Sequence, residues 1–165
     1  MIDEKVYITD RGGIIIEETE ALDDEILSDS SPLTSQIIEL PDDPYAGKDV
    51  YLSIEGGQEV FYRGTYVNKI RLTGENITVG RRDVMAGHYP DIDLAMYWRQ
   101  DRTISRKHLQ IYRDVNGVYF VEDLCNHNAT FLNSYQCPLN KTRAELKPGD
   151  RILVSMSIAI DFCVQ

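Results

Sequence analysis

Short apolar runs, each broken by a polar turn, fill the chain from Val50 to its end. The runs are rich in Val, Ile and Tyr, and many of the breaks contain glycine, which is typical of β-strands joined by turns. We see no convincing amphipathic helix, so the sequence predicts an all-β sandwich or barrel of about 120 residues. The pattern predicts strands at 50–54, 59–62, 66–72, 76–80, 108–112, 118–124, 130–133, 151–154 and 158–164.

The first 45 residues have a different pattern. They hold 13 acidic residues against two basic ones, a net charge of −11, whereas residues 46–165 hold 14 acids and 15 bases, a net of +1. Their apolar positions follow no sustained period, and the composition is typical of a flexible acidic segment. We therefore expect an acidic, largely flexible tail at 1–45, disordered or docked, and a β domain at 46–165. Two tail segments could be ordered: 21–27 as a helical turn or two, and 14–16 as an addition to a sheet edge.

Composition argues against several classes of protein. The chain has no run of 18 or more apolar residues and no basic segment followed by an apolar one at its start, so we expect a cytoplasmic protein without membrane insertion. Its three cysteines, Cys125, Cys137 and Cys163, are widely spaced and lack a C-x-x-C pair, which predicts free thiols and neither a metal site nor disulfides. A near-neutral domain beside an acidic tail is unsuited to nucleic acid. We expect no cofactor.

Three predicted loops gather polar and charged residues immediately beside strands. They are Gly80 to Asp83, the Ser-Arg-Lys-His segment at 105–108, and the segment 123–130. The loops of a β-sandwich gather at its two ends, so residues far apart in sequence can meet on one surface. If these loops meet, they bring together guanidinium, hydroxyl, imidazole and amide groups. Such a set suits a compact oxyanion, above all a phosphate.

Four short motifs, in this order and at about this spacing, resemble those of the forkhead-associated (FHA) domain family. The similarity runs from about residue 50 to the end of the chain, and it implies an eleven-stranded β-sandwich whose apical loops bind phosphothreonine peptides. It also implies a small bacterial adaptor or regulator, with a phosphothreonine-containing protein of a Ser/Thr kinase pathway as its partner. The motifs are Gly80-Arg81, Ser105-x-x-His108, Asn128-x-Thr130 followed by Asn133, and Leu146-x-x-Gly149-Asp150.

The resemblance implies a direct role for four residues. Arg81 would contact the phosphate and help to order the loops. Ser105 would donate its hydroxyl to a phosphate oxygen, and Arg106 would add positive charge beside it. Asn128 would hold the backbone of the bound peptide.

Three further residues would support the site, and two positions depart from the family pattern. Gly80, His108 and Thr130 would be structural, His108 by bracing its loop through backbone hydrogen bonds. His127 stands where the family usually has a small hydroxyl residue that contacts the phosphate, and Ala129 stands where it often has glycine. An imidazolium at His127 would strengthen phosphate binding, whereas crowding by the ring would weaken it. We count His127 among the peptide-binding residues.

Two other functions need to be weighed. Asp123, His127 and Ser105 include the residue types of a hydrolytic triad, but the chain has no G-x-S-x-G, H-E-x-x-H or Walker motif, so we do not expect an enzyme. The alternative is an FHA fold used for phosphate-independent protein assembly, which His127 and Ala129 permit.

The tail contains two threonines that suit recognition by an FHA domain. Thr19 is followed three positions later by Leu22, and Thr34 by Ile37, an apolar spacing that suits many members of the family. Thr19 and Thr34 are therefore candidate phosphosites for self-recognition, which tethering would favour. The simpler hypothesis is that the tail only links or solubilises.

Overall fold

The computed structural model describes residues 3–8, 14–19, 43–74, 76–98, 103–125, 128–156 and 158–165. These residues belong to two units, with the boundary between Asp42 and Asp43. The division into a tail at 1–45 and an FHA domain at 46–165 stays a prediction.

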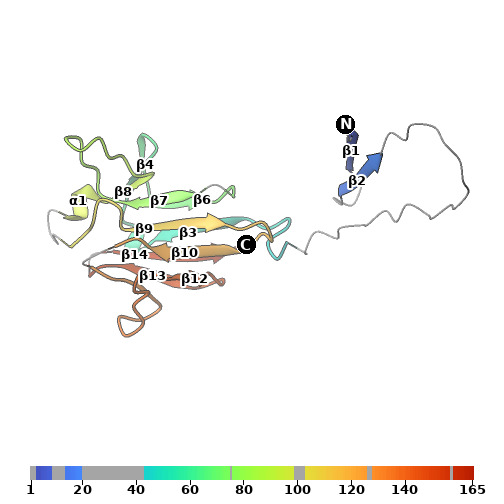
Figure 1. Ribbon diagram of the computed structural model, residues 1–165. Coiled ribbons are helices and arrows are strands. Elements are labelled where there is room, and N and C mark those ends of the chain that lie inside the picture. Colours follow the sequence, from blue (N-terminus) through green and yellow to red (C-terminus); the bar gives the residue numbers. More distant parts are fainter. Residues whose placement is uncertain are drawn as a thin grey trace, which may run out of the picture. The chain divides into compact units, whose positions relative to one another are not determined.

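The described part of the first unit is a hairpin of two antiparallel strands (Figure 1). Strand β1 (Asp3–Ile8) pairs with β2 (Ile14–Thr19), so that Asp3 lies opposite Thr19 and Ile8 opposite Ile14. The isoleucines at 14–16 thus lie in a strand, as considered from the sequence, but they pair with the segment 6–8. The second segment considered, 21–27, lies outside the described residues.

The second unit is a β-sandwich of two sheets (Figure 1). One short 3-10 helix, Glu55–Gly57, and one four-residue helix, α1 (Ala95–Trp98), interrupt its strands. The strands are β3 (Val50–Ile54), β4 (Val60–Tyr62), β5 (Thr65–Val67), β6 (Lys69–Arg71), β7 (Ile77–Gly80), β8 (Ile92–Asp93), β9 (Leu109–Arg113), β10 (Tyr119–Asp123), β11 (Thr130–Leu132), β12 (Arg143–Glu145), β13 (Arg151–Val154) and β14 (Ile158–Val164).

The two sheets confirm the predicted sandwich. One has seven strands in the order β12-β10-β9-β7-β8-β4-β5, and the other has five in the order β11-β13-β14-β3-β6. Twelve strands are thus described in this unit, against the eleven that the resemblance implied. The pairs are antiparallel except for β7 with the two-residue strand β8, which run parallel.

The apolar run predicted as one strand at 66–72 forms two strands in different sheets. Its first part belongs to β5 of the seven-stranded sheet and its second part to β6 of the five-stranded sheet. The chain crosses between the sheets at Asn68, whose carbonyl accepts the Ile54 N–H at 2.8 Å. The prediction of one continuous strand was therefore wrong. Both halves contain residues typical of β-strands, and nothing in the sequence between them marks the crossing from one sheet to the other.

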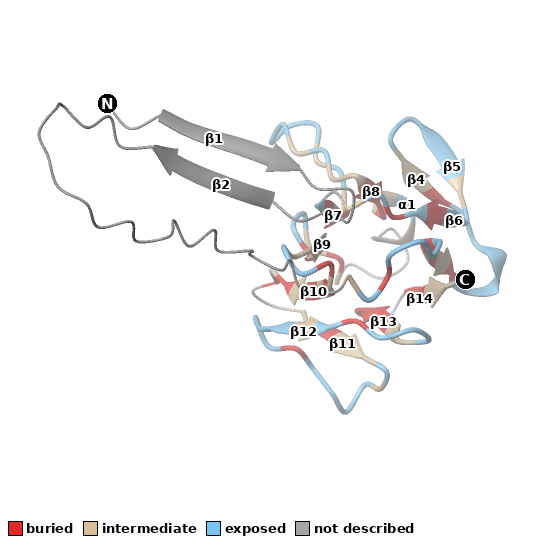
Figure 2. Ribbon diagram, turned by 90° about the vertical axis from the view of Figure 1, so that its right-hand side faces the viewer, coloured by how far each residue is buried: buried red, intermediate tan, exposed pale blue. Residues whose placement is uncertain are grey.

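Alternating apolar residues of both sheets form the core (Figure 2). In β3, for example, Val50, Leu52 and Ile54 are buried while the residues between them are half-buried. A fully buried aliphatic side chain contributes about 1.5–3 kcal/mol, so this alternation fixes which face of each strand points inward. At one place the core is aromatic: the rings of Tyr119 and Phe162 lie 5.5 Å apart, and Tyr45 packs edge-on against both.

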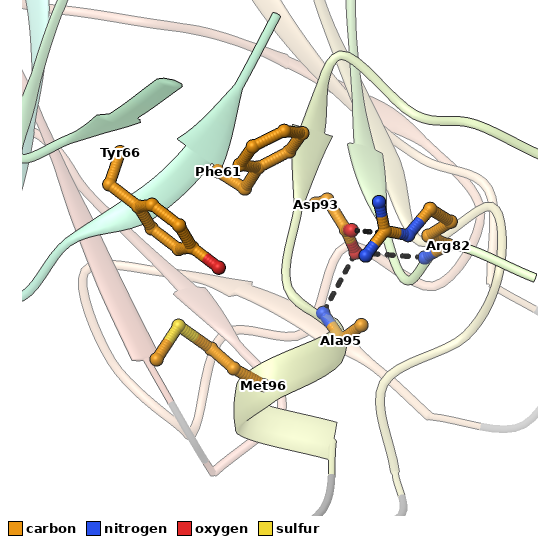
Figure 3. A pocket seen from close by; sticks show the side chains of 6 residues that line it. All are labelled: Phe61, Tyr66, Arg82, Asp93, Ala95 and Met96. Carbon is orange, nitrogen blue, oxygen red and sulfur yellow. Dashed lines mark hydrogen bonds and ion pairs between the residues drawn. The ribbon is translucent and has the colours of Figure 1, made fainter. Parts of the chain in front are cut away.

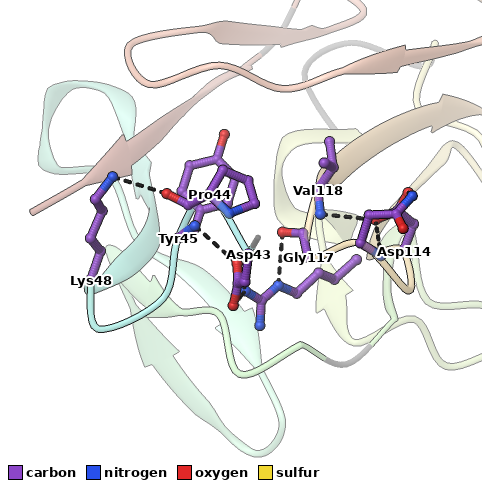
Figure 4. A network of polar contacts seen from close by, with 9 residues as sticks. Asp43, Pro44, Tyr45, Lys48, Asp114, Gly117 and Val118 are labelled. Atoms are coloured by element: carbon purple, nitrogen blue, oxygen red, sulfur yellow. Dashed lines mark hydrogen bonds and ion pairs between the residues drawn. The ribbon is translucent and has the colours of Figure 1, made fainter. Parts of the chain in front are cut away.

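A polar network holds the start of the second unit against the turn between β9 and β10 (Figure 4). The Asp43 carboxylate accepts the Tyr45 N–H at 2.9 Å and pairs with the Arg113 guanidinium, whose Nε donates to the Gly117 carbonyl at 2.9 Å. A β-carbon on Gly117 would lie 2.4 Å from an Asp43 oxygen, so the contact requires glycine there. The network ties the segment 43–45 to the sheet.

Replacing Asp43 by asparagine is expected to lower the free energy of unfolding at pH 7 by up to about 1 kcal/mol, because solvent screens this half-exposed pair. The Tyr45 N–H and then the Arg113 guanidinium hold the pKa of Asp43 below its usual value. A carboxyl of this kind stabilises the fold above its unfolded pKa of about 3.9, and that stability is lost as the pH falls through the lower folded pKa. Urea unfolding should show the difference between Asp43→Asn and wild type at pH 7 and its shrinkage below about pH 4. An equally large difference at about pH 2 would contradict the assignment.

Candidate functional site

The three polar loops lie at one end of the sandwich. Strand β7 ends at Gly80, and its antiparallel neighbour β9 begins at Leu109; β10, antiparallel to β9, ends at Asp123. The loops after β7, before β9 and after β10 therefore meet at the same end of these neighbouring strands of the seven-stranded sheet.

Gly80 lets the first two loops touch through their backbones. A β-carbon on Gly80 would lie 1.9 Å from the Arg106 carbonyl oxygen, a distance that no side chain tolerates. The Arg81 N–H donates to the Ser105 carbonyl at 3.1 Å, and the His108 N–H donates to the Val79 carbonyl at 3.0 Å. Glycine is needed here for the close approach of two backbones.

The two arginines of the predicted site share a carboxylate. Arg81 donates its Nε–H to the Ile104 carbonyl at 3.1 Å, and its Nη1 lies 3.9 Å from Asp83 Oδ2. Nη1 of Arg106, on the next loop, lies 3.7 Å from the same oxygen. These long ion pairs are weak individually. They nevertheless place two guanidinium groups, one from each loop, around one anionic group.

His88 braces this arrangement, a role that sequence reasoning missed. Asp83 and His88 form an isolated bridge with reciprocal backbone hydrogen bonds of 3.0 and 2.9 Å. The His88 Nε2–H donates to the Arg106 carbonyl at 2.7 Å. The sequence showed the histidine in a polar loop, but nothing in its spacing linked it to Arg106, 18 positions away.

His108 is fully buried and holds the Ser105 loop from below. Its Nδ1 accepts the Ser105 N–H at 3.1 Å, and its carbonyl accepts the Leu124 N–H at 2.9 Å. Because the N–H of Ser105 occupies Nδ1, the ring proton lies on Nε2. That Nε2 is buried without a hydrogen-bond partner among the described residues. The ring links the second loop to the third.

The side chain of Ser105 contacts a cysteine of the third loop. Its Oγ lies 2.8 Å from the Sγ of Cys125, which is buried and lies 3.8 Å from His108 Nδ1. Burial raises the pKa of this thiol, whereas hydrogen bonds from the Ser105 hydroxyl and the Asn128 N–H to the sulfur lower it. Nothing in the spacing of Ser105 and Cys125 along the chain indicated this contact.

A buried carboxylate fixes the third loop. Asp123 Oδ1 accepts the Thr130 hydroxyl at 2.9 Å and the Cys125 N–H at 3.2 Å, and its Oδ2 accepts the Lys141 N–H at 3.0 Å. Thr130 is fully buried. Asn128 lies half-buried beside this cluster, while the neighbouring His127 lies outside the described residues. The role predicted for His127 therefore stays a prediction.

Asn133 and the last motif, Leu146-x-x-Gly149-Asp150, stabilise a turn away from these loops. Asn133, which has a positive φ of 64°, donates from its amide to Asp150 Oδ1 at 2.9 Å and accepts the Arg151 N–H at 2.8 Å. Asp150 Oδ2 accepts the Lys147 N–H at 2.8 Å. These hydrogen bonds to backbone N–H groups account for Asn133 and Asp150 in this part of the chain.

Arg82 pairs with the buried carboxylate of Asp93 (Figure 3). Its N–H donates to Asp93 Oδ1 at 2.9 Å, and its Nε lies 3.3 Å from Asp93 Oδ2, a carboxylate that is 5% exposed. The pair lines a cavity of about 240 Å³ together with aromatic and apolar side chains. The remaining lining residues are Phe61, Tyr66, Ala95 and Met96.

Chemically, the loops offer donors and positive charge. The loops that meet here have two guanidinium groups and one hydroxyl, groups that bind oxyanions through hydrogen bonds, which are charge-assisted for the guanidinium groups. Within the described ranges, His, Cys, Asp and Glu side chains form no group of three that could hold a metal ion. Among those same residues, no helix has the length and apolar character needed to cross a membrane.

Comparison with known proteins identifies the family. The FHA domain family model matches residues 77–155, which include all the loops described above. The fold resembles the N-terminal FHA domain of S. cerevisiae Rad53p, solved with a phosphothreonine peptide, at a TM-score of 0.53 and 18% identity over 71% of this chain and 94% of that one.

A second solved structure, the FHA domain of Rv0020c, has a TM-score of 0.50 and 24% identity, and the alignment covers 73% of this chain and 96% of that chain. A search of curated proteins finds no significant match. The two-sheet arrangement and the glycine-tethered loops agree with this match, and residues 77–155 are therefore part of a forkhead-associated domain.

Proposed function

We propose that this chain is a phosphothreonine-peptide-binding module that acts as a cytoplasmic signalling adaptor or regulator downstream of a Ser/Thr kinase. The observation that supports the proposal is that the loops of Arg81 and Ser105 meet at one end of the sandwich, where the guanidinium groups of Arg81 and Arg106 lie beside the Asp83 carboxylate. The Rad53p FHA domain, which shares the fold, was solved with such a peptide. Its partner is a phosphorylated protein, and neither nucleic acid nor membrane insertion is part of the function.

Asp83 explains how two guanidinium groups stay close together before a ligand arrives. Its carboxylate carries one negative charge at 3.9 Å from Arg81 and 3.7 Å from Arg106. A phosphate near neutral pH carries up to two charges and three strong acceptor oxygens, so it can compete for these donors. Each charge-assisted hydrogen bond that it gains is worth about 1.5–3 kcal/mol. The Ser105 hydroxyl adds a neutral donor.

The arrangement around Ser105 supports binding and not catalysis. Its Oγ contacts the Cys125 sulfur, and the nearest described histidine, His108, uses Nδ1 to accept the Ser105 N–H. The Asp123 carboxylate, considered as the acid of a triad, is occupied by Thr130, Cys125 and Lys141.

A peptide-library screen tests the proposed function. Purified chain should bind a subset of phosphothreonine peptides, and dephosphorylated copies of the selected sequences should bind at least about tenfold more weakly, because they lose the charge-assisted bonds. Phosphoserine copies measure the contribution of the threonine methyl group. Equal binding of phosphorylated and dephosphorylated peptides would exclude a phosphate reader and favour phosphate-independent assembly.

Self-recognition of a phosphorylated tail stays a prediction. Thr19 is the last residue of β2, opposite Asp3, and Thr34 lies outside the described residues. A chain carrying phosphothreonine at 19 or 34 should bind an external phosphopeptide more weakly than the unmodified chain, because a tethered ligand has an effective concentration in the millimolar range. Unchanged affinity would leave the tail as a linker.

A further inference from the structure

The hydroxyl of Ser105 has a partner that the proposed function does not use. Cys125 lies 20 positions away on the third loop, and its Sγ sits 2.8 Å from Ser105 Oγ. Both residues are held by their backbones: the Ser105 N–H donates to His108 Nδ1, and the Cys125 N–H donates to Asp123 Oδ1. The thiol is 4% exposed, so solvent competes little for this contact.

The number of protons between these two atoms decides what Ser105 can donate. A hydroxyl has one proton and two lone pairs, and a neutral thiol has one proton. His108 Nδ1 already accepts the Ser105 N–H, which makes Ser105 Oγ the main acceptor for the thiol proton. When Cys125 donates S–H to Oγ, the Ser105 proton can point to a ligand. When the sulfur is a thiolate, it accepts that proton and the ligand loses a donor.

We propose that Cys125 is a positioning residue of the phosphate site: its protonated thiol turns the Ser105 hydroxyl toward the bound phosphate, and its thiolate withdraws that donor. The inference rests on the proposed function and adds a residue that the resemblance did not assign. Phosphate binding is then coupled to the proton on Cys125.

The groups around the thiol set the pH at which this coupling operates. Burial raises the pKa of Cys125, whereas hydrogen bonds from the Ser105 hydroxyl and the Asn128 N–H to the sulfur lower it. Facing it are the His108 ring at 3.8 Å and the Asp123 carboxylate, which accepts its N–H. Arg106 follows Ser105 on the same loop, and Arg81, whose N–H donates to the Ser105 carbonyl, lies on the neighbouring loop with Asp83.

The direction of the pH dependence follows from charge. A phosphate dianion beside Ser105 disfavours a second negative charge on Cys125, so binding raises the pKa of the thiol and takes up a proton. Affinity is therefore highest below the pKa of the unliganded thiol and falls as the pH rises through it. The phosphate group of the peptide has a second pKa of about 6, so its own ionisation raises the affinity as the pH rises. This effect is the same for every variant.

The experiment compares affinity for one phosphothreonine peptide, selected by the library screen, between about pH 6.5 and about pH 9.5, a range that includes the ordinary pKa of a cysteine thiol, about 8.5. Cys125→Ser keeps a donor and an acceptor at the same place but does not ionise in this range. Cys125→Ala removes the partner altogether. Cys163→Ser, at a half-buried thiol in β14, is the matched control.

Wild type and Cys163→Ser should lose at least about fivefold in affinity across the range relative to Cys125→Ser, because one unit of pKa shift corresponds to a tenfold change. Cys125→Ala should also lack this pH step. Ultraviolet absorbance of thiolate in the unliganded proteins gives a second readout: wild type should show a titration within this pH range that Cys125→Ser lacks.

The outcomes separate this inference from the proposed function. If wild type binds the phosphopeptide and the ratio of its affinity to that of Cys125→Ser is constant with pH, the inference is overturned and phosphate reading stands. If no phosphothreonine peptide binds at any pH, the proposed function itself fails. A Cys125 thiol that does not titrate within this pH range also removes the coupling.

Discussion

Replacing Arg81 by alanine is expected to cut affinity for a phosphothreonine peptide at least about tenfold, because each charge-assisted hydrogen bond is worth about 1.5–3 kcal/mol. Its guanidinium is a quarter exposed and held by the Ile104 carbonyl, so it reaches a ligand at little entropic cost. Isothermal titration calorimetry gives the affinity, and thermal unfolding shows whether the domain is still folded.

Two controls separate the specific contact from charge in general. Arg71→Ala removes the same charge from β6, where the side chain is 73% exposed, and should change the affinity less than about twofold. Arg81→Lys keeps the charge but loses the planar fork, so its affinity should lie between wild type and Arg81→Ala. A folded Arg81→Ala protein with wild-type affinity would remove the phosphate-reader proposal.

Gly80→Ala is expected to lower the free energy of unfolding by about 3 kcal/mol or more, a large effect for one methyl group. The added β-carbon would lie 1.9 Å from the Arg106 carbonyl oxygen and 3.0 Å from that of Ser105, so one of the two backbones must move. That movement displaces the residues proposed to hold the phosphate. Denaturant unfolding and peptide titration should therefore both report a loss.

Gly64→Ala is the comparison that isolates the clash. Gly64 has a φ of +100° but no atom within 4 Å of an added β-carbon, so its cost is only that of a strained backbone, about 1–2 kcal/mol. It should leave phosphopeptide affinity unchanged. Equal stability losses in Gly64→Ala and Gly80→Ala would show that the close contact between the two loops is not a stabilising feature.

The strands with one buried face could be predicted from the sequence. In β3 and β10 every second residue is buried, and in β9 Leu109 and Ile111 are; these positions are visible as alternating apolar residues, except Asp123 at the end of β10. The edge strand β12 (Arg143–Glu145) and the two-residue β8 could not be found in this way. The first has two exposed charged residues out of three, and the second is too short to have a period.

The candidate site could be predicted as a set of loops, but its internal contacts could not. Gly80, Arg81 and Ser105 were identified because their spacing matches the family, and antiparallel strands bring their loops to one end. The contacts of His88 with Arg106 and of Cys125 with Ser105 depend on loop conformations that leave no periodic signal. Such contacts must be read from coordinates.

Phosphate recognition by these loops can be tested by an NMR titration of the isotope-labelled chain with one selected phosphothreonine peptide. Backbone amides of residues 80–83, 105–108 and 128 should shift, while those of β6 and β14 in the other sheet should not. The dephosphorylated peptide, at the same concentrations, should leave all of them in place. Shifts of equal size with both peptides, or shifts confined to another surface, would contradict phosphate recognition by these loops.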